Sequence, residues 1–391
     1  MDSPLLGVYN PISLNIKYGE DNYLFTDKKE KYLDTYSGIA VNILGHRHPV
    51  IDQAIQTQSQ KYLHLSNVFE SSVQNDLAKQ LINKTHMSKV FFSNSGTEAN
   101  EAALKIVRKW GHSIHPNKKE IIAVNQAFHG RSSAGMALSN PRETLKEFAP
   151  LLGSINHVKF NDINHLKEQV SENTCAIFLE LIYGSGGLDH LTHEFLAQVS
   201  LLAKQYHFLI VVDEIQTGLY RTGPFLATFD TPLNPDIVTL AKGIGGGLPL
   251  GATLVNEKLK NILVPGDHGS TFGGNPLACA LGDAILNHMD QAFLDKVNDA
   301  IIYLNHQMKT LKHMYPLTIK QLKGKGFMRG IEVGEYAAYI QQEALKHHVL
   351  FNTVQNTTLR LLPALTFNKT HIDQMVNVLR IIIDPLEKRL S

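Results

Sequence analysis

The sequence predicts an α/β protein, with a central, mostly parallel β-sheet between helices and a smaller α+β domain built from both termini. Three observations support this prediction. Several short runs in the middle of the chain are apolar throughout, which is typical of strands buried on both faces. Amphipathic segments separate these runs, as the crossovers between parallel strands require. Both ends of the chain lack this alternation and carry hairpin-like patterns instead.

The elements of the middle region follow from the spacing of their apolar residues. Helices show apolar positions three or four residues apart, and the strands are continuous apolar runs that end in polar or glycine-rich segments. In chain order we expect a strand and turn at 89–96, a helix at 97–111, strands at 120–125 and 175–184, a helix at 193–206, and strands at 208–214 and 236–242.

The two ends are predicted to form one smaller domain. Residues 1–45 contain GEDNYLFTDKKEKYLD, in which polar turns separate short strand-like runs. Beyond about residue 285 the chain contains an amphipathic helix and the strand-like segments GFMRGIEV and TTLRLLPAL. We therefore expect a large domain at 46–284, completed by a small domain from 1–45 and 285–391.

Composition excludes several classes of protein. The 391 residues are 43% apolar and 19% charged, which is ordinary for a globular protein. With 37 basic and 36 acidic residues and no long Lys/Arg block, no nucleic-acid partner is expected. No apolar run reaches the ~18 residues of a membrane span. Two cysteines exclude a disulfide framework, and the N-terminus lacks a signal-peptide pattern, so a cytoplasmic location is expected.

Ligands of parallel α/β sheets bind beyond the carboxyl ends of the strands, and two charged residues end apolar runs here. Lys242 follows VTLA, and burial there would lower its pKa and favour Schiff-base chemistry. Asp213 ends LIVVD and would suit the protonated ring nitrogen of a pyridine cofactor. Taken alone, Lys242 is equally a lysine extending from a strand end, and Asp213 a cap of the following turn.

Further candidate ligand-binding residues lie in three segments. In SNSGTEAN, residues Ser95, Gly96 and Thr97 precede a helix whose N-terminus would attract a phosphate, although an ordinary capping box fits too. In AFHGRS, Phe128 offers an aromatic face and Arg131 a fork for carboxylates. HGSTFGGNP offers hydroxyl groups between glycines. No metal is expected, because His46 and His48 form an isolated His-X-His pair without a third ligand.

These segments occur together and in order, and the chain resembles the class-III, fold-type-I pyridoxal-phosphate aminotransferases, close to the acetylornithine aminotransferases. The resemblance is nearly end to end. It is carried by YLDTYSGIAVNILGHRHP, FFSNSGTEANEAALKIVRKWG, FHGRSSAGMALS, VVDEIQTGLYRTG, LAKGIGGGLPLGA, GSTFGGNPLACA and LRLLPALT.

The resemblance implies pyridoxal 5'-phosphate as the cofactor and a homodimer with shared active sites. Lys242 would bind the cofactor covalently and then serve as the base, and Asp213 would pair with the ring nitrogen. The remaining roles implied are phosphate binding by Ser95, Gly96 and Thr97, ring contacts by Phe128, Ile215 and Gln216, phosphate binding from the partner subunit by Thr271, and substrate binding by Arg131, Ser270 and Arg360.

The implied reaction moves the terminal amino group of N2-acetyl-L-ornithine to 2-oxoglutarate, in arginine biosynthesis. Ile39 fits this donor or 4-aminobutyrate, because the ornithine enzymes tend to carry a tyrosine there. Three alternatives stay open: another ω-amine donor (ornithine, succinylornithine or 4-aminobutyrate), an aminomutase that needs no second keto acid, and a cofactor-binding protein without activity.

One segment departs from the family pattern. Where relatives have Glu-Pro-(Val/Ile)-Gln-Gly-Glu-Gly-Gly, this chain has ELIYGSGG, so Tyr183 replaces the glutamine and Ser185 the second glutamate. In relatives that glutamate can pair with the arginine that corresponds to Arg360. Because a serine cannot neutralise a guanidinium, we expect Arg360 to be permanently open and to favour α-carboxylates, or the donor to differ. The alternative is that nearby groups shield Arg360.

Overall fold

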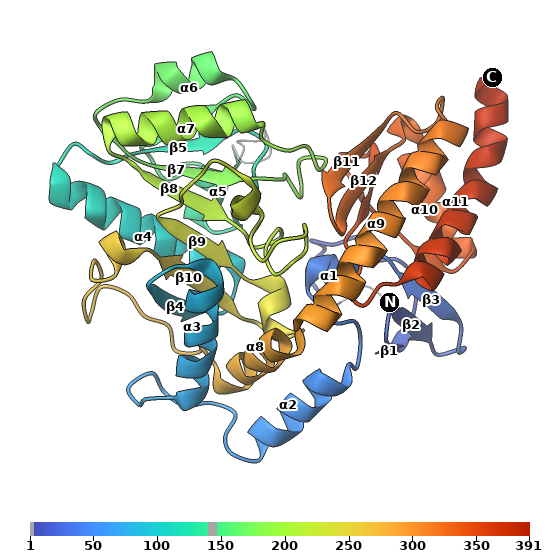
Figure 1. Cartoon of the computed structure of the whole chain (residues 1–391), viewed down its shortest axis with the longest axis horizontal. Helices are drawn as coiled ribbons and strands as arrows, with labels where there is room; N and C mark the ends of the chain where they lie inside the picture. The colour runs from blue at the N-terminus through green and yellow to red at the C-terminus, as the bar shows by residue number, and fades with distance from the viewer. Residues whose placement is uncertain (1–3, 140–146) are drawn as a thin grey trace.

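The computed structural model describes residues 4–139 and 147–391. Its largest sheet has seven strands in the order β4-β10-β9-β8-β7-β5-β6 (Figure 1). All neighbouring pairs are parallel except those of β10, which is antiparallel to β4 and β9. This confirms the predicted mostly parallel sheet. The strands are β4 (Lys89–Ser93), β5 (Glu120–Val124), β6 (Ile155–Val158), β7 (Thr174–Glu180), β8 (Leu209–Asp213), β9 (Ile237–Leu240) and β10 (Gly251–Val255).

Helices cover both faces of this sheet, which explains why its central strands are apolar throughout. In β8, Leu209 and Val211 pack with residues of α4 on one face. Ile210 and Val212 pack with residues of α7 on the other face. The helices of this part of the chain are α2 (Pro49–Ser59), α3 (Ser72–Thr85), α4 (Gly96–Ile114), α5 (Ser133–Leu138), α6 (Ile163–Gln169), α7 (His193–Tyr206) and α8 (Pro276–His288).

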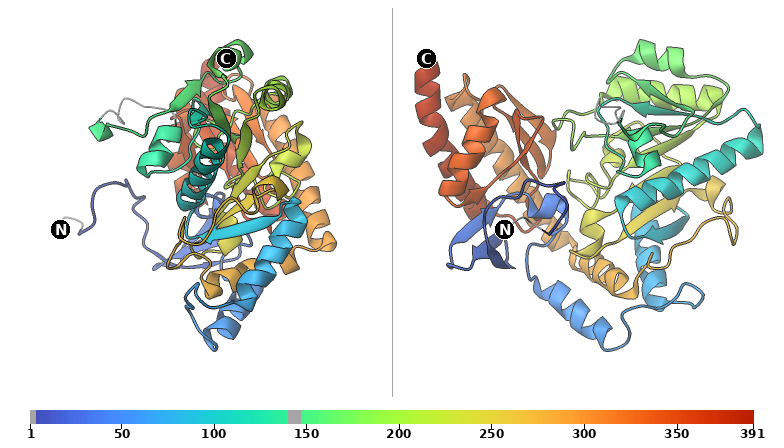
Figure 2. Two further views of the ribbon diagram at one scale, coloured as in Figure 1. Left: turned by 90° about the vertical axis from the view of Figure 1, so that its left-hand side faces the viewer. Right: turned by 180° about the vertical axis from the view of Figure 1, so that it is seen from behind.

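Both ends of the chain contribute to a second group of elements (Figure 2). One four-stranded sheet has the order β1-β2-β3-β13, and its parallel pairing of Leu33 with Val349 joins the two ends. The other sheet has the order β11-β12-β15-β14. These elements are β1 (Ile16–Glu20), β2 (Tyr23–Thr26), β3 (Lys31–Asp34), α1 (Ser37–Ala40), α9 (Gln291–Met314), β11 (Gln321–Lys325), β12 (Met328–Glu332), α10 (Ala337–Lys346), β13 (Val349–Leu350), β14 (Asn352–Val354), β15 (Thr358–Leu361) and α11 (Lys369–Leu390).

The structure differs from the predicted elements in a few places. The strand expected at 175–184 ends at Glu180, because the chain folds back and Ile182 bridges to His190. Strands β6 and β10 were not predicted. The predicted boundaries at 45 and 284 stay a prediction, and residues 1–3 and 140–146 of those ranges lie outside the described residues. Across the described ranges, no helix is both long and apolar enough to cross a membrane.

Candidate active site

A cavity of about 1190 Å³ opens at the carboxyl ends of β7, β8 and β9. Its lining includes the last residues of two strands, Glu180 and Asp213, and Lys242, two residues beyond the end of a third. Arg360 of β15 lines it from the second group of elements. The volume exceeds the roughly 300–1,000 Å³ usual for small-molecule sites, so a ring-shaped cofactor and a substrate fit together. The predicted strand-end residues thus meet in one cavity.

Asp213 is buried, and both of its carboxylate oxygens accept hydrogen bonds. Oδ2 accepts from Asn100 Nδ2 at 2.8 Å and contacts His129 Nδ1 at 2.9 Å. Oδ1 accepts from the backbone N–H of Ile215 at 3.0 Å. The Asp213 side chain is therefore fixed in position where it lines the cavity.

The two side chains that hold Asp213 are themselves fixed. Asn100 donates a second hydrogen bond to the carbonyl of His129 at 2.9 Å and accepts one from Thr239 at 2.9 Å. Burial opposes a charge on His129, but the hydrogen bond and charge of Asp213 outweigh it and raise the histidine's pKa. His129 and Asn100 therefore fix the position of Asp213 together.

Lys242 begins a short 3₁₀ helix (η3, Lys242–Gly245), and its backbone has a left-handed φ of 52°. A side chain in that conformation costs roughly 1–2 kcal/mol, and such strain is typical of functional sites. Burial lowers the pKa of Lys242 to about 8, although the negative charges of Asp213 and Glu180 oppose the shift. A useful fraction of the amine is therefore neutral, and nucleophilic, near neutral pH.

Glu180 ends β7 beside these charges. Its Oε2 accepts a hydrogen bond from the backbone N–H of Phe128 at 2.7 Å, so it holds the aromatic residue in place. Burial, and then the negative charge of Asp213, raise the pKa of Glu180 to about 7. Glu180 is therefore partly protonated near pH 7.

The N-terminus of α4 faces the cavity with Ser95, Gly96 and Thr97. Ser95 caps the helix by accepting a hydrogen bond from the backbone N–H of Glu98 at 3.2 Å, which confirms the predicted cap. Within the described ranges, no partner bonds the backbone N–H groups of Gly96 and Thr97. Free N–H groups at a helix N-terminus suit a phosphate, and the cap uses a different N–H group, that of Glu98.

Four other predicted ring and carboxylate contacts also line the cavity. Arg131 Cζ lies 5.5 Å from the centre of the Phe128 ring, so the two flank one wall together. A Cβ added to Gly96 would lie 2.6 Å from Ile215 Cδ1, which shows how closely Ile215 covers the helix start. Gln216 Oε1 is buried without a partner in the described residues. An orphaned buried acceptor marks a position where a bound hydroxyl group would fit.

Arg360 is buried and is held by neutral acceptors, not by a carboxylate. Its Nε and Nη2 donate to Asn352 Oδ1 at 2.9 and 2.5 Å, and Nη1 donates to the carbonyl of Gly184 at 2.8 Å. Nearby neutral groups thus contact Arg360, as the alternative expected, and among the described residues no salt bridge pairs its charge with a carboxylate. The expected effect on the choice of substrate stays a prediction. Burial lowers the pKa of Arg360 to about 10, and the guanidinium stays charged at neutral pH.

Ser270 and Thr271 stand apart from the other predicted residues, because neither lines the cavity of its own chain. The Ser270 hydroxyl accepts a hydrogen bond from Asn94 Nδ2 at 3.2 Å, and Asn94 lines the cavity. Thr271 is exposed. The structure therefore brings together ten of the twelve predicted residues, and leaves Ser270 and Thr271 on the rim and the surface.

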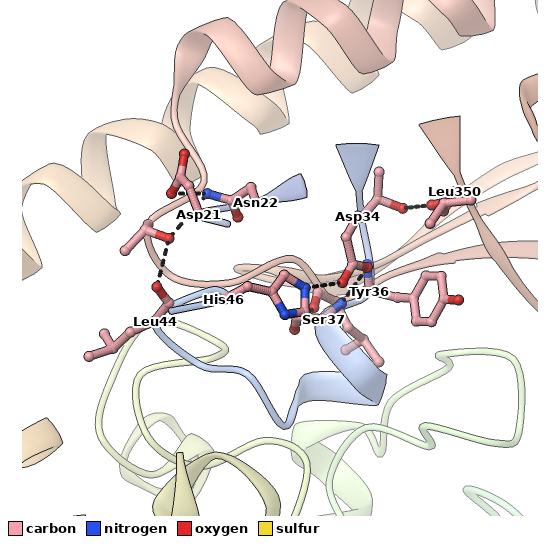
Figure 3. A network of polar contacts seen from close by, with 11 residues as sticks. Asp21, Asn22, Asp34, Tyr36, Ser37, Leu44, His46 and Leu350 are labelled. Atoms are coloured by element: carbon pink, nitrogen blue, oxygen red, sulfur yellow. Dashed lines mark hydrogen bonds and ion pairs between the residues drawn. The ribbon is translucent and has the colours of Figure 1, made fainter. Parts of the chain in front are cut away.

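The strained turn at α1 lines the cavity with Gly38 and Ile39, and Figure 3 shows the polar contacts of Asp34 and Ser37 beside it. All four residues of α1 have φ between 44° and 65°, which is costly for Ile39. Asp34 offsets this cost: its Oδ1 accepts from the backbone N–H of Ser37 at 2.9 Å, and its Oδ2 contacts His46 Nε2 at 3.0 Å. The Ser37 hydroxyl donates to the carbonyl of Leu362 at 2.7 Å. This network places Ile39 against the cavity.

The two histidines considered for a metal have local partners instead. His46 binds Asp34, and His48 Nδ1 accepts from the backbone N–H of Val50 at 3.3 Å at the start of α2. The described part of the chain contains no group of three or more metal-ligating side chains.

Sequence reasoning missed the residues that act through others. His129 and Asn100 lie in the quoted segments AFHGRS and TEAN, but only three-dimensional contact reveals that they hold Asp213. Asn352 had no signal at all, because it is an ordinary polar residue in a short strand. Its pairing partner across the hairpin is Arg360, eight residues later.

Comparisons with known proteins agree with this geometry. The family model of class-III aminotransferases matches residues 7–383. The chain is 40% identical to the acetylornithine aminotransferase of Agrobacterium fabrum, over 93% of this chain and 92% of that protein.

Two solved structures have a similar fold. The N-acetylornithine aminotransferase of Stenotrophomonas maltophilia is 29% identical, with a TM-score of 0.83 over 96% of this chain and 97% of that one. The ornithine aminotransferase of Toxoplasma gondii is 26% identical, with a TM-score of 0.92 over 99% of this chain and 93% of that one, and it was found with pyridoxal phosphate partly occupying its active site.

Proposed function

The chain belongs to the class-III aminotransferase family, and we propose that it is a pyridoxal-phosphate enzyme that moves the terminal amino group of N2-acetyl-L-ornithine to 2-oxoglutarate. The products are N-acetylglutamate semialdehyde and glutamate. The observation that carries this proposal is the 40% identity to an acetylornithine aminotransferase over nearly the whole chain. The cavity supports it, because Lys242, Asp213 and two arginines lie around one space.

The residues present fit the cofactor. The free N–H groups of Gly96 and Thr97 suit its phosphate, and the orphaned Gln216 Oε1 suits its ring hydroxyl. Asp213 suits the protonated ring nitrogen, and Phe128 and Ile215 suit the two ring faces. When bound, pyridoxal phosphate supplies an aldehyde that condenses with amines and a ring that accepts the electrons of a breaking C–H bond.

Each charged residue then has a task that follows from its surroundings. The lowered pKa of Lys242 makes its amine partly neutral, so Lys242 would hold the cofactor and, while its amine is free, would carry the proton that leaves the substrate. Asn100 and His129 hold Asp213, which would face the ring nitrogen. Arg131 and Arg360 would bind substrate carboxylates.

Two cavity features bear on the choice of donor. Ile39 lines the cavity with an aliphatic side chain, which fits acetylornithine or 4-aminobutyrate better than ornithine. Ser185 supplies no carboxylate to pair with Arg360, and Asn352 and Gly184 shield that arginine instead. Ornithine is the second candidate, because solved ornithine aminotransferases have the same fold.

The donor is tested by titrating the purified holoenzyme with each amine in the absence of keto acid and recording its visible spectrum. Acetylornithine should bleach the absorbance of the lysine-bound cofactor at the lowest concentration, and ornithine, succinylornithine and 4-aminobutyrate should need higher ones. Bleaching by another amine alone would contradict the proposed donor. Turnover without added 2-oxoglutarate would favour an aminomutase.

We also propose that the active form is a homodimer in which the partner subunit's Thr271 reaches the cofactor phosphate. In support, Thr271 is exposed and lies outside its own cavity. Three apolar side chains near it are also exposed: Val68 by 83%, Phe69 by 63% and Phe272 by 60%. Sedimentation should give a dimer, and Phe69→Asp should give an inactive monomer. An active monomer would contradict the proposal.

The proposed reaction belongs to arginine biosynthesis in the cytoplasm. Expression of the chain should restore growth without arginine to a host that lacks acetylornithine aminotransferase activity, whereas the Lys242→Ala variant should not. Cell fractionation should recover the activity with the cytoplasmic proteins. Failure of a well-expressed chain to restore growth would contradict the assignment.

A further inference from the structure

Arg360, the residue proposed to bind the α-carboxylate of the keto acid, is a buried cation without a salt bridge among the described residues. Arg360 is 6% exposed, and buried cations are normally paired with an anion. Its three hydrogen bonds instead reach two neutral oxygens, Oδ1 of Asn352 and the carbonyl of Gly184. Among the described residues, no salt bridge joins it to a carboxylate, and the negative charge of Glu180 acts on it only from beyond that distance. The guanidinium is thus oriented but not neutralised.

The orientation of Asn352 is fixed by chemistry. An arginine only donates hydrogen bonds, so the amide oxygen must face the guanidinium and the amide nitrogen must face away. Asn352 and Arg360 are also paired across the β14-β15 hairpin. One oxygen therefore bridges Nε and Nη2, the edge of the guanidinium that a carboxylate would grip with two oxygens.

We propose that Asn352 determines specificity for the acceptor: its neutral amide oxygen holds Arg360 in place while leaving the positive charge available to the α-carboxylate of a dicarboxylic keto acid. This rests on the proposed use of 2-oxoglutarate. A neutral acceptor is displaced by an incoming carboxylate without breaking an ion pair. A carboxylate at the same position would compete with the substrate, because two anions cannot share one guanidinium without repulsion.

Two substitutions of Asn352 separate the effect of its charge from the effect of its shape. Asn352→Asp keeps the size and the acceptor oxygen but adds a negative charge beside Arg360. Asn352→Ala removes the hydrogen bonds and adds no charge. If Asn352 only supported the structure, Asp would replace it well and Ala poorly. If its neutrality matters, the order is reversed.

The test is binding of glutarate to the holoenzyme, measured by calorimetry. Glutarate offers two carboxylates and no keto group, so no turnover occurs and the identity of the amine donor does not enter. Asn352→Asp should weaken binding at least ~10-fold, and Asn352→Ala about 3-fold. Asn356→Asp is the matched control, because it adds the same charge to the same hairpin at a residue that lines the cavity but does not contact Arg360. The Kd of Asn356→Asp for glutarate should lie within about 2-fold of that of the parent enzyme.

Three outcomes would overturn the inference: parental binding by Asn352→Asp, an equal loss in Asn356→Asp, or a larger loss in Asn352→Ala than in Asn352→Asp. If Asn352→Asp does not fold, Asn352→Ala decides, because a loss above 10-fold would indicate a purely structural role. A different amine donor in the spectral titration would overturn the proposed function and leave this order of affinities intact.

Discussion

The two ends of the cavity hold their charges in opposite ways. At the sheet, Asp213 is surrounded by donors that include the histidine His129, whose own pKa is raised. At the hairpin, the hydrogen bonds of Arg360 within the described residues all go to neutral acceptors. A permanently paired carboxylate suits a cofactor that stays bound, whereas an unpaired guanidinium suits a carboxylate that must arrive and leave. The surroundings of each charge thus match how long its ligand stays.

The largest effect on activity is expected from removing the negative charge of Asp213 at the end of β8. Asp213→Asn keeps the shape but removes the anion that would keep the cofactor ring protonated. We expect kcat to fall by about 10²–10³, the usual loss when one electrostatic partner of a reacting group is removed. Steady-state kinetics with saturating cofactor measures this. A variant within 3-fold of the parent would show that Asp213 does not contact the reacting ring.

Removal of the partner that holds Asp213 should have a smaller effect. His129→Leu deletes a hydrogen bond to a charged group, which is worth about 1.5–3 kcal/mol, or roughly 10- to 100-fold in rate. Because the imidazole acts through Asp213, the pH profile of kcat should also shift, whereas a loss of packing alone would lower kcat equally at every pH. Unchanged kinetics would remove His129 from the account.

The pH dependence of cofactor uptake tests whether burial lowers the pKa of Lys242, which lines the same cavity as Asp213 and Arg360. The lysine must be neutral to attack the aldehyde, and its pKa is lowered to about 8. Uptake of pyridoxal phosphate by the cofactor-free protein should therefore rise about tenfold from pH 7 towards a plateau above about pH 8. Stopped-flow absorbance measures the rate. A rise that continues to pH 10 would mean that burial does not lower this pKa.

The smallest effect concerns the loop that carries Gly184. The hydroxyl of Tyr183 is buried without a partner in the described residues, and its ring packs edge-on against Phe160 at 4.9 Å. Tyr183→Phe should leave activity unchanged and raise the free energy of unfolding by about 1 kcal/mol, because an unsatisfied polar group is removed. Urea denaturation measures this. A loss of stability would reveal a bonding partner for the hydroxyl.

The sequence predicted the cavity residues that lie at strand ends. Lys242 and Asp213 follow apolar runs, and parallel strands bring their carboxyl ends to one edge, so their proximity follows from the pattern. The N-terminus of α4 was predictable in the same way from its cap. Both predictions follow from local sequence patterns and from the rule that parallel strands place their carboxyl ends at one edge of a sheet.

The site residues that the sequence did not predict depend on contacts between distant segments of the chain. His129 and Asp213 are 84 residues apart, and no periodicity links them. The shield of Arg360 depends on the register of a short hairpin, which places Asn352 opposite the arginine. A change of one residue in that register would turn Asn352 to the other face. The absence of a carboxylate at Ser185 was visible in the sequence, but the neutral replacement was not.

The most direct test of the central claim, that Lys242 and Asp213 form the cofactor centre, is to reduce the holoenzyme with borohydride and to map the modified peptide by mass spectrometry. Reduction fixes the cofactor to the amine that holds it. We expect one added cofactor per chain, on Lys242 alone, and none in Lys242→Ala. Modification of another lysine, or no modification in a protein that binds pyridoxal phosphate, would contradict it.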